Sequence, residues 1–102
     1  MKLKIKDEIS EGTASRVAEL FNALSDTSRI LLLVALLHHE RNVGSLAEMA
    51  RISESAVSHH LRNLRLLHLV RARKQGRQVF YRLDDDHISD LIRSGLDHVQ
   101  HG

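Results

Sequence analysis

The hydrophobic and polar positions between residues 13 and 39 follow the helical period. One helix is predicted from about Thr13, because its apolar residues recur every three or four positions. Ser25-Asp26 then offers an N-cap for a second helix, and the segment 30–37 within it is almost wholly apolar, so this helix should be buried on most sides. A polar loop is expected over residues 38–42. The apolar positions of the first helix are Val17, Leu20, Phe21 and Leu24.

Two short helices about a tight turn are predicted between residues 45 and 67. The segment 45-SLAE-48 has the pattern of a capping box, in which the Ser and the Glu satisfy each other's free backbone donors, so a helix should begin there. Residues 51–53 form the turn, and Ser53 can cap a second helix that runs to about Leu67. Placed every 100° around that helix, three apolar residues fall together and should pack on the core. They are Val57, Leu61 and Leu64.

A β-hairpin is predicted over residues 69–83. Two runs rich in β-branched and aromatic residues, 69–73 and 78–83, flank the turn Lys74-Gln75-Gly76-Arg77. The acidic run 84–86 then supplies an N-cap and a negatively charged first turn for a last helix, which extends to residue 101. A helix-turn-helix followed by a hairpin is typical of a winged helix-turn-helix, so the fold should be mainly α with a β-hairpin wing.

Length and composition indicate one small domain over residues 1–102, with an N-terminal arm, 1–12, whose first residues form a loose arm or a short strand. Only three residues are aromatic, and a core of this size is often completed by a second copy of the chain, so a homodimer is expected. The absence of Cys excludes disulfides, thiolate metal sites and thiol redox sensing. Because no signal peptide or membrane-spanning run is visible, the expected location is the cytoplasm, with no membrane partner.

The outer face of the second helix of the pair is polar and basic, and it carries no acidic residue from Ser55 onward. Its Ser side chains allow close approach to a major groove, His59 and Arg62 can reach base edges, and Arg65 can reach a phosphate. An ordinary solvated face would look similar, but the basic hairpin tip adds a second element suited to a phosphate backbone. Double-stranded DNA is therefore the predicted partner. The predicted DNA-binding residues are Ser55, Ser58, His59, Arg62, Arg65, Arg73, Lys74, Gln75 and Arg77.

The segments 23-ALSDTSRILLL-33, 53-SESAVSHHLRNLRLLHLV-70 and 74-KQGRQVFYRL-83 resemble the ArsR/SmtB family of metal-responsive bacterial repressors. With the Asp and His residues of the last helix, the resemblance covers nearly all of residues 17–101. It implies a homodimeric repressor that binds operator DNA without metal and leaves it when metal binds. The similarity is greatest to the zinc- and cobalt-responsive members with a metal site on the last helix. Asn42 stands where members with a second site have Cys, so a thiolate site for cadmium, lead or arsenite is not available.

Four metal-ligand side chains lie near the two ends of the last helix. Because His87 and His98 are eleven residues apart, or about 16 Å along the axis, they cannot bind one ion within one helix. An apolar stripe that includes Leu91 and Val99 invites pairing with a second copy, and a two-fold axis makes paired helices antiparallel. The start of one helix then meets the end of the other, forming two sites of three nitrogens and one oxygen, which suit Zn(II) or Co(II). The predicted ligands are Asp85, His87, His98 and His101.

Two other classes of function are considered. The first is a winged-helix regulator of the same fold that senses no metal, its His residues serving solubility or the dimer contact. A small metal-dependent hydrolase is disfavoured, because the sequence shows no nucleophile paired with a base, no phosphate-binding loop and no general acid beside the predicted metal ligands. The chain is therefore predicted not to be an enzyme.

Overall fold

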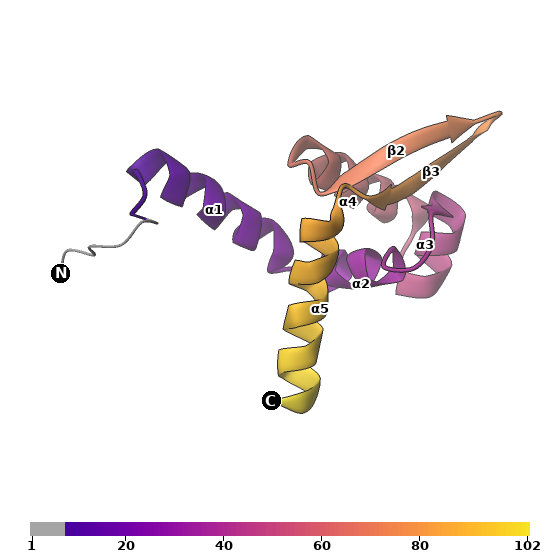
Figure 1. Ribbon diagram of the computed structural model, residues 1–102. Coiled ribbons are helices and arrows are strands. Elements are labelled where there is room, and N and C mark those ends of the chain that lie inside the picture. Colours follow the sequence, from indigo (N-terminus) through magenta and orange to yellow (C-terminus); the bar gives the residue numbers. More distant parts are fainter. Residues whose placement is uncertain (1–7) are drawn as a thin grey trace.

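The computed structural model describes residues 8–102, and the predicted arm or strand in residues 1–6 lies outside this range. Figure 1 shows the predicted order of four helices, a hairpin and a final helix, with one short strand added before the third helix. The elements are α1 (Glu11–Leu24), α2 (Thr27–Ala35), β1 (Arg41–Asn42), α3 (Val43–Ala50), α4 (Glu54–Leu66), β2 (Val70–Gln75), β3 (Gln78–Leu83) and α5 (Asp86–His101).

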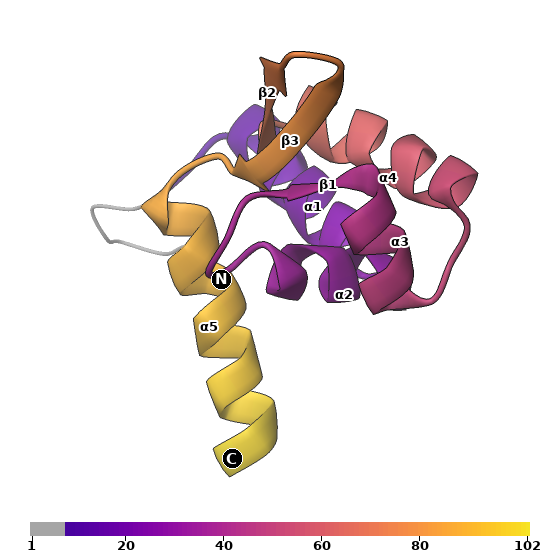
Figure 2. The same cartoon turned by 90° about the vertical axis from the view of Figure 1, so that its right-hand side faces the viewer.

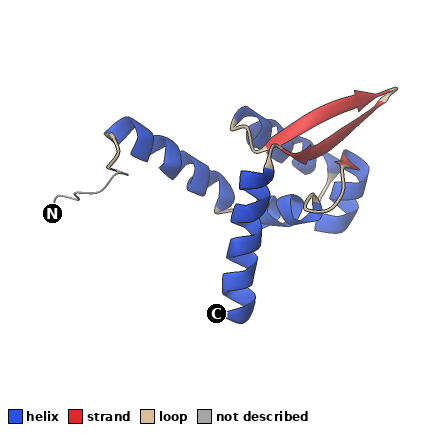
Figure 3. Ribbon diagram, in the orientation of Figure 1, coloured by secondary structure: helices blue, strands red, loops and turns tan. Residues whose placement is uncertain are grey.

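The strands form one antiparallel sheet in the order β1-β3-β2 (Figure 3). In the hairpin, Val70 pairs with Leu83 and Gln75 pairs with Gln78, and Gly76 adopts the positive φ of 61° that this two-residue turn requires. The expectation of a polar loop over residues 38–42 was wrong at its end. Arg41 and Asn42 are extended and pair with Tyr81 and Phe80, which covers the free edge of β3 (Figure 2).

The helix caps agree with the sequence in three places and differ in one. Asp26 and Ser53 cap α2 and α4 as predicted, and within the acidic run the cap of α5 is Asp85. The predicted capping box at Ser45 was wrong. Asn42 caps α3, because its extended backbone lets Oδ1 accept the N–H of Ser45 at 2.9 Å, so the helix begins two residues before Ser45.

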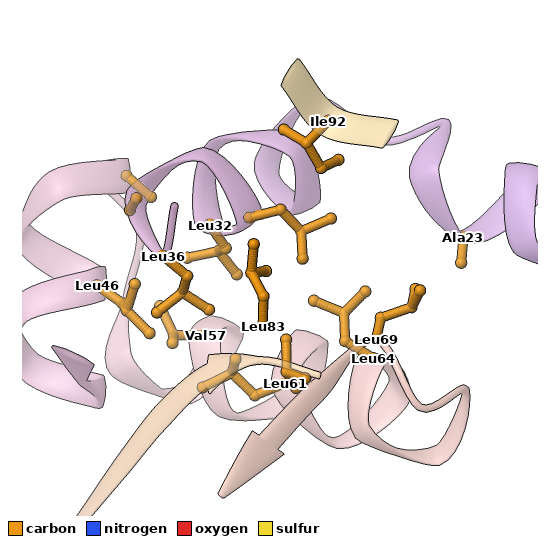
Figure 4. Close-up of a cluster of buried hydrophobic side chains, with 14 of the residues drawn as sticks. Ala23, Leu32, Leu36, Leu46, Val57, Leu61, Leu64, Leu69, Leu83 and Ile92 are labelled. Atoms are coloured by element: carbon orange, nitrogen blue, oxygen red, sulfur yellow. The ribbon is translucent and has the colours of Figure 1, made fainter. Parts of the chain in front are cut away.

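The core lies between α2, the helix-turn-helix, the base of the hairpin and the first half of α5 (Figure 4). Val57, Leu61 and Leu64 are buried, which confirms the predicted inner face of α4. Ile92 is the buried contribution of α5. Fixing α4 by one face leaves its other face in solvent. The fully buried side chains are Leu32, Leu33, Leu46, Leu61, Leu64, Leu69, Val57 and Val70.

Two helices extend away from this core. In Figure 1, α1 runs out to one side and α5 runs downward, each with one end far from the wing. Their apolar residues are therefore incompletely covered: Phe21 on α1 is 53% exposed and Val99 on α5 is 81% exposed. Apolar side chains on free helix faces lose hydrophobic stabilisation that a second surface would restore.

Candidate nucleic-acid interface and metal centre

The predicted DNA-binding face of α4 is open to solvent. It lies opposite the buried residues of the same helix, and the Ser53 hydroxyl, which accepts the N–H of Ala56 at 3.0 Å, fixes where the helix begins. A second anchor comes from α2, where Nε of Arg29 donates a 3.1 Å hydrogen bond to Nδ1 of His60. The helix is thus held by its inner side while its outer side presents hydroxyl, imidazole and guanidinium groups. The exposed residues of this face are Ser55, Ser58, His59, Arg62 and Arg65.

The hairpin of β2 and β3, hereafter the wing, projects beyond the body of the protein (Figure 1). Its tip residues Lys74, Gln75 and Arg77 are exposed. A cavity of about 590 Å³ lies beside α4, lined by Arg62 and Arg65 and, from β3, by Tyr81. Sequence reasoning missed Tyr81, although alternation along β3 from the buried Leu83 places it on the α4 side of the hairpin.

Arg73 differs from the other predicted DNA-binding residues of the wing. Its guanidinium is engaged within the protein, at 2.9 Å from a carboxylate oxygen of Glu40 in the segment before β1. The hydrogen bond from Arg73 lowers the pKa of the Glu40 carboxyl below its ordinary value, with a smaller contribution from the charge of Arg82. Sequence reasoning missed Glu40, which lies 33 residues from Arg73 and belongs to no local motif.

At the start of α5, Asp85 has two roles. Its Oδ1 accepts the N–H of Ile88 at 3.2 Å, and its Oδ2 lies 3.5 Å from Nδ1 of His87. The backbone N–H of Ile88, followed by His87, lowers the pKa of the Asp85 carboxyl, so this group is an anion at neutral pH. The His87 side chain is 94% exposed. An anionic oxygen and an accessible imidazole are thus adjacent at this end of the helix.

At the other end of α5, His98 and His101 lie one turn apart and are exposed. Nδ1 of His101 lies 3.0 Å from Oδ1 of Asp97, four residues earlier on the helix. A carboxylate that accepts from one ring nitrogen orients the imidazole and leaves the other nitrogen free for a metal ion. Asp97 was missed in the sequence, where the i, i+4 spacing of Asp and His was the available signal.

The two pairs of predicted ligands lie at opposite ends of one straight helix. Within the described residues 8–102 of a single protomer, no three His, Asp or Glu side chains are close enough together to hold an ion. The donor set itself fits zinc, since imidazole nitrogens and one carboxylate oxygen are common tetrahedral ligands. Each end supplies half of that set.

An apolar groove runs between these two ends, on the side of α5 that faces α1 and α2. Its volume is about 380 Å³, and almost all of its lining is carbon. Val99, at the outer end of the groove, is the most exposed large apolar residue described in the chain. The residues that line the groove are Leu24, Ile30, Leu91, Ile92, Gly95, Leu96 and Val99.

No helix described in residues 8–102 has the length and apolar character needed to cross a bilayer.

Comparison with known proteins identifies relatives of the whole arrangement. The Transcriptional repressor SmtB homolog of Synechocystis sp. is 48% identical over 87 residues, which cover 85% of this chain and 66% of that protein. The Cadmium resistance transcriptional regulatory protein CadC homolog of Staphylococcus aureus is 34% identical, covering 93% and 79%. The Transcriptional activator HlyU of Vibrio cholerae is also 34% identical, covering 80% and 76%. These relatives are transcriptional regulators and not enzymes.

The structural comparison agrees with this grouping. The solution structure of apo-NmtR superimposes with a TM-score of 0.79 at 34% identity, covering 99% of this chain and 85% of the other. The family described as "Bacterial regulatory protein, arsR family" matches residues 26–72, from the cap of α2 into β2. The chain therefore belongs to the ArsR family of bacterial regulatory proteins, and it is a winged helix-turn-helix transcriptional regulator.

Proposed function

We propose that the protein is a transcriptional repressor that binds operator DNA as a metal-free homodimer and leaves it when Zn(II) or Co(II) binds between the last helices. In this account the outer face of α4 enters the major groove and the tip of the wing follows the adjacent phosphates. The observation that carries the proposal is the layout of α5. Two incomplete ligand pairs lie at its two ends, and an exposed apolar groove lies between them.

The groove supports pairing with a second copy of the chain. A two-fold axis through this face sets the two α5 helices antiparallel, which brings Asp85 and His87 of one protomer toward His98 and His101 of the other. The site then has three imidazole nitrogens and one carboxylate oxygen. A metal ion in each of the two sites would bind ligands from both protomers, and so would link the protomers at both ends of the helix pair.

The start of α5 also connects to the wing. Nε of Arg71 in β2 lies 2.8 Å from Oδ1 of Asp84, next to the proposed ligand Asp85. Fixing the relative position of the α5 helices would therefore restrict the wing as well as the spacing of the two α4 helices. A hundredfold loss of DNA affinity requires that metal bind the free dimer about 2.7 kcal/mol more tightly than the DNA-bound dimer.

The cadmium in the name of the Staphylococcus relative does not identify the metal here. Soft thiolate ligands favour such ions. This chain has no Cys, and it carries Asn42 where family members with a second metal site have Cys. Imidazole and carboxylate ligands instead suit zinc or cobalt. As a DNA-binding regulator, the protein would act in the cytoplasm.

Titration of the metal-free protein with cobalt(II), followed by zinc, tests the proposal. We expect intense visible bands that saturate at one cobalt per chain and are bleached by zinc, as a tetrahedral site requires. In parallel, anisotropy of a labelled duplex, selected by the protein from a random 30-base-pair pool, should fall when zinc is added. DNA binding without any saturable cobalt signal would contradict metal sensing and favour a regulator of the same fold that responds to something else, a role compatible with the HlyU relative.

A further inference from the structure

Every nitrogen of the Arg73 guanidinium donates a hydrogen bond, two of them to Glu40 and the third to Gln75. Nε donates to both carboxylate oxygens of Glu40 at 3.2 Å, and Nη2 donates to Oε1 at 2.9 Å. The remaining Nη1 donates to Oε1 of Gln75 at 2.8 Å. The guanidinium also lies over the Phe80 ring, with Cζ 5.3 Å from its centroid. This planar, forked arrangement is specific to Arg, because an ammonium group cannot match a carboxylate with two parallel bonds.

The direction of the Arg73 side chain follows from the sheet. Val70 is buried against the core, so Arg73, three residues later, lies on the opposite face of β2. Arg73 pairs with Phe80 on β3, and Glu40 directly precedes β1 on the far side of β3. The side chain therefore crosses β3 and points toward β1, on the face of the wing that is turned away from the cavity beside α4.

The position of this contact along the wing is its second informative feature. Beyond Arg73, every residue from Lys74 to Gln78 is exposed, and Figure 1 shows the tip of the hairpin projecting past the other elements. Near the same strand, Nδ2 of Asn42 donates to Oε1 of Gln78 at 3.2 Å. The segment 40–42 thus holds the wing from one side, just before the part that carries the basic tip.

We propose that Glu40 and Arg73 form a brace that sets the position of the wing tip on DNA, so that Arg73 acts as a positioning residue and does not contact phosphate. The inference rests on the proposed DNA-binding function. A tip that is already oriented loses less conformational freedom on binding, which favours the complex. On charge alone, removing a carboxylate from a DNA-binding surface would raise the affinity for DNA. If Glu40 positions the wing tip, its removal should instead lower that affinity.

The experiment measures binding of the selected 30-base-pair duplex over a series of salt concentrations. The variants are Glu40→Ala, Arg73→Lys, Arg73→Gln and the double variant Glu40→Ala/Arg73→Gln, with Glu48→Ala on the exposed face of α3 as a control for the same charge change. The brace predicts that Glu40→Ala and both Arg73 variants weaken binding by about three- to tenfold, and that the double variant is no weaker than Arg73→Gln. In the Glu40 and Arg73 variants, the slope of log affinity against log salt concentration should equal that of wild type. The control Glu48→Ala should not weaken binding.

A direct phosphate contact by Arg73 predicts the opposite pattern. Arg73→Lys would then retain affinity, and Glu40→Ala would bind as well as wild type or better. For Arg73→Gln, the slope of log affinity against log salt concentration would become shallower by about one, as expected for the loss of one phosphate contact. Any of these results overturns the brace. Wild-type protein that selects no duplex would instead overturn the proposed function, and the brace with it. Thermal unfolding of each variant checks that the fold is intact.

Discussion

Arg29 of α2 and His60 of α4 are joined by a half-buried hydrogen bond in which Nε of Arg29 donates to Nδ1 of His60 at 3.1 Å. The bond connects the DNA-binding helix to the helix behind it, across 31 residues of sequence. His60 must offer an unprotonated Nδ1, so the proton of its neutral ring is on Nε2. The neighbouring His59 points instead to the exposed face. The two adjacent histidines therefore have different roles.

Replacing His60 by Leu should lower the free energy of unfolding by about 1 kcal/mol, because a half-buried guanidinium loses its acceptor. His60→Asn, whose amide oxygen can take the place of Nδ1, should retain most of the stability. Urea unfolding followed by circular dichroism measures both. His59→Leu is the matched control, since it should reduce DNA affinity at unchanged stability. A His60→Leu protein as stable as wild type would show that the bond contributes nothing.

The Glu40–Arg73 pair should stabilise the protein only while Glu40 is ionised. The hydrogen bond from Arg73 lowers the folded-state pKa of Glu40 below the unfolded value of about 4.5. A lowered pKa means that the stabilisation is complete above the unfolded value and is lost as the pH falls through the folded one. The melting temperature of Glu40→Ala should therefore lie below that of wild type at pH 7, and the difference should shrink progressively as the pH falls below 4.5. A difference that persists unchanged at acid pH would assign the effect to packing.

His98→Ala should leave operator affinity without metal within about twofold of wild type and abolish release by zinc, because ligation and DNA contact lie on different elements. Anisotropy of the labelled duplex, with and without zinc, measures both properties. His39→Ala, at an exposed position after α2, is the control and should respond to zinc normally. Loss of DNA binding by His98→Ala in the absence of metal would show that the residue is structural.

Asp97→Asn should weaken metal binding by about ten- to a hundredfold, because the carboxylate 3.0 Å from Nδ1 of His101 orients that ring. DNA binding by the metal-free protein should be unchanged. Zinc competition against a chromogenic chelator provides the affinity. Asp90→Asn removes the same charge from another exposed position of α5 and should have little effect. Equal losses in the two variants would assign the effect to net charge near the site.

The order of elements and the inner face of α4 could be predicted because both depend on local periodicity. Val57, Leu61 and Leu64 fall on one side of any helix with this spacing, and the short segment 51–53 permits only a turn. The error at Ser45 has a different cause. Asn42 caps the helix instead, and its extended backbone is linked to the pairing of β1 with β3, which only the folded chain provides.

Two of the contacts that sequence reasoning missed connect distant residues. Arg29 meets His60 across 31 residues, and Glu40 meets Arg73 across 33, so neither pair appears in a helical or strand period. Because the contact with Glu40 is not visible in the local sequence, the charge of Arg73 and its place on the hairpin suggested a DNA contact. In the folded chain, the side chain points toward β1. For α5 the limit is different. The proposed metal site needs a second copy of the helix, so one chain contains only its two halves.

Complementation between two inactive variants tests the intersubunit site most directly. One protomer carries Asp85→Ala and His87→Ala, the other carries His98→Ala and His101→Ala, and two affinity tags allow the mixed dimer to be isolated. Each variant alone should give no tetrahedral cobalt spectrum, because both of its sites lack ligands. In the mixed dimer, one site keeps all four ligands, so the account predicts the spectrum restored at one cobalt per dimer. A mixed dimer without any cobalt spectrum, alongside a wild-type protein that shows one, would contradict a site shared between the two chains.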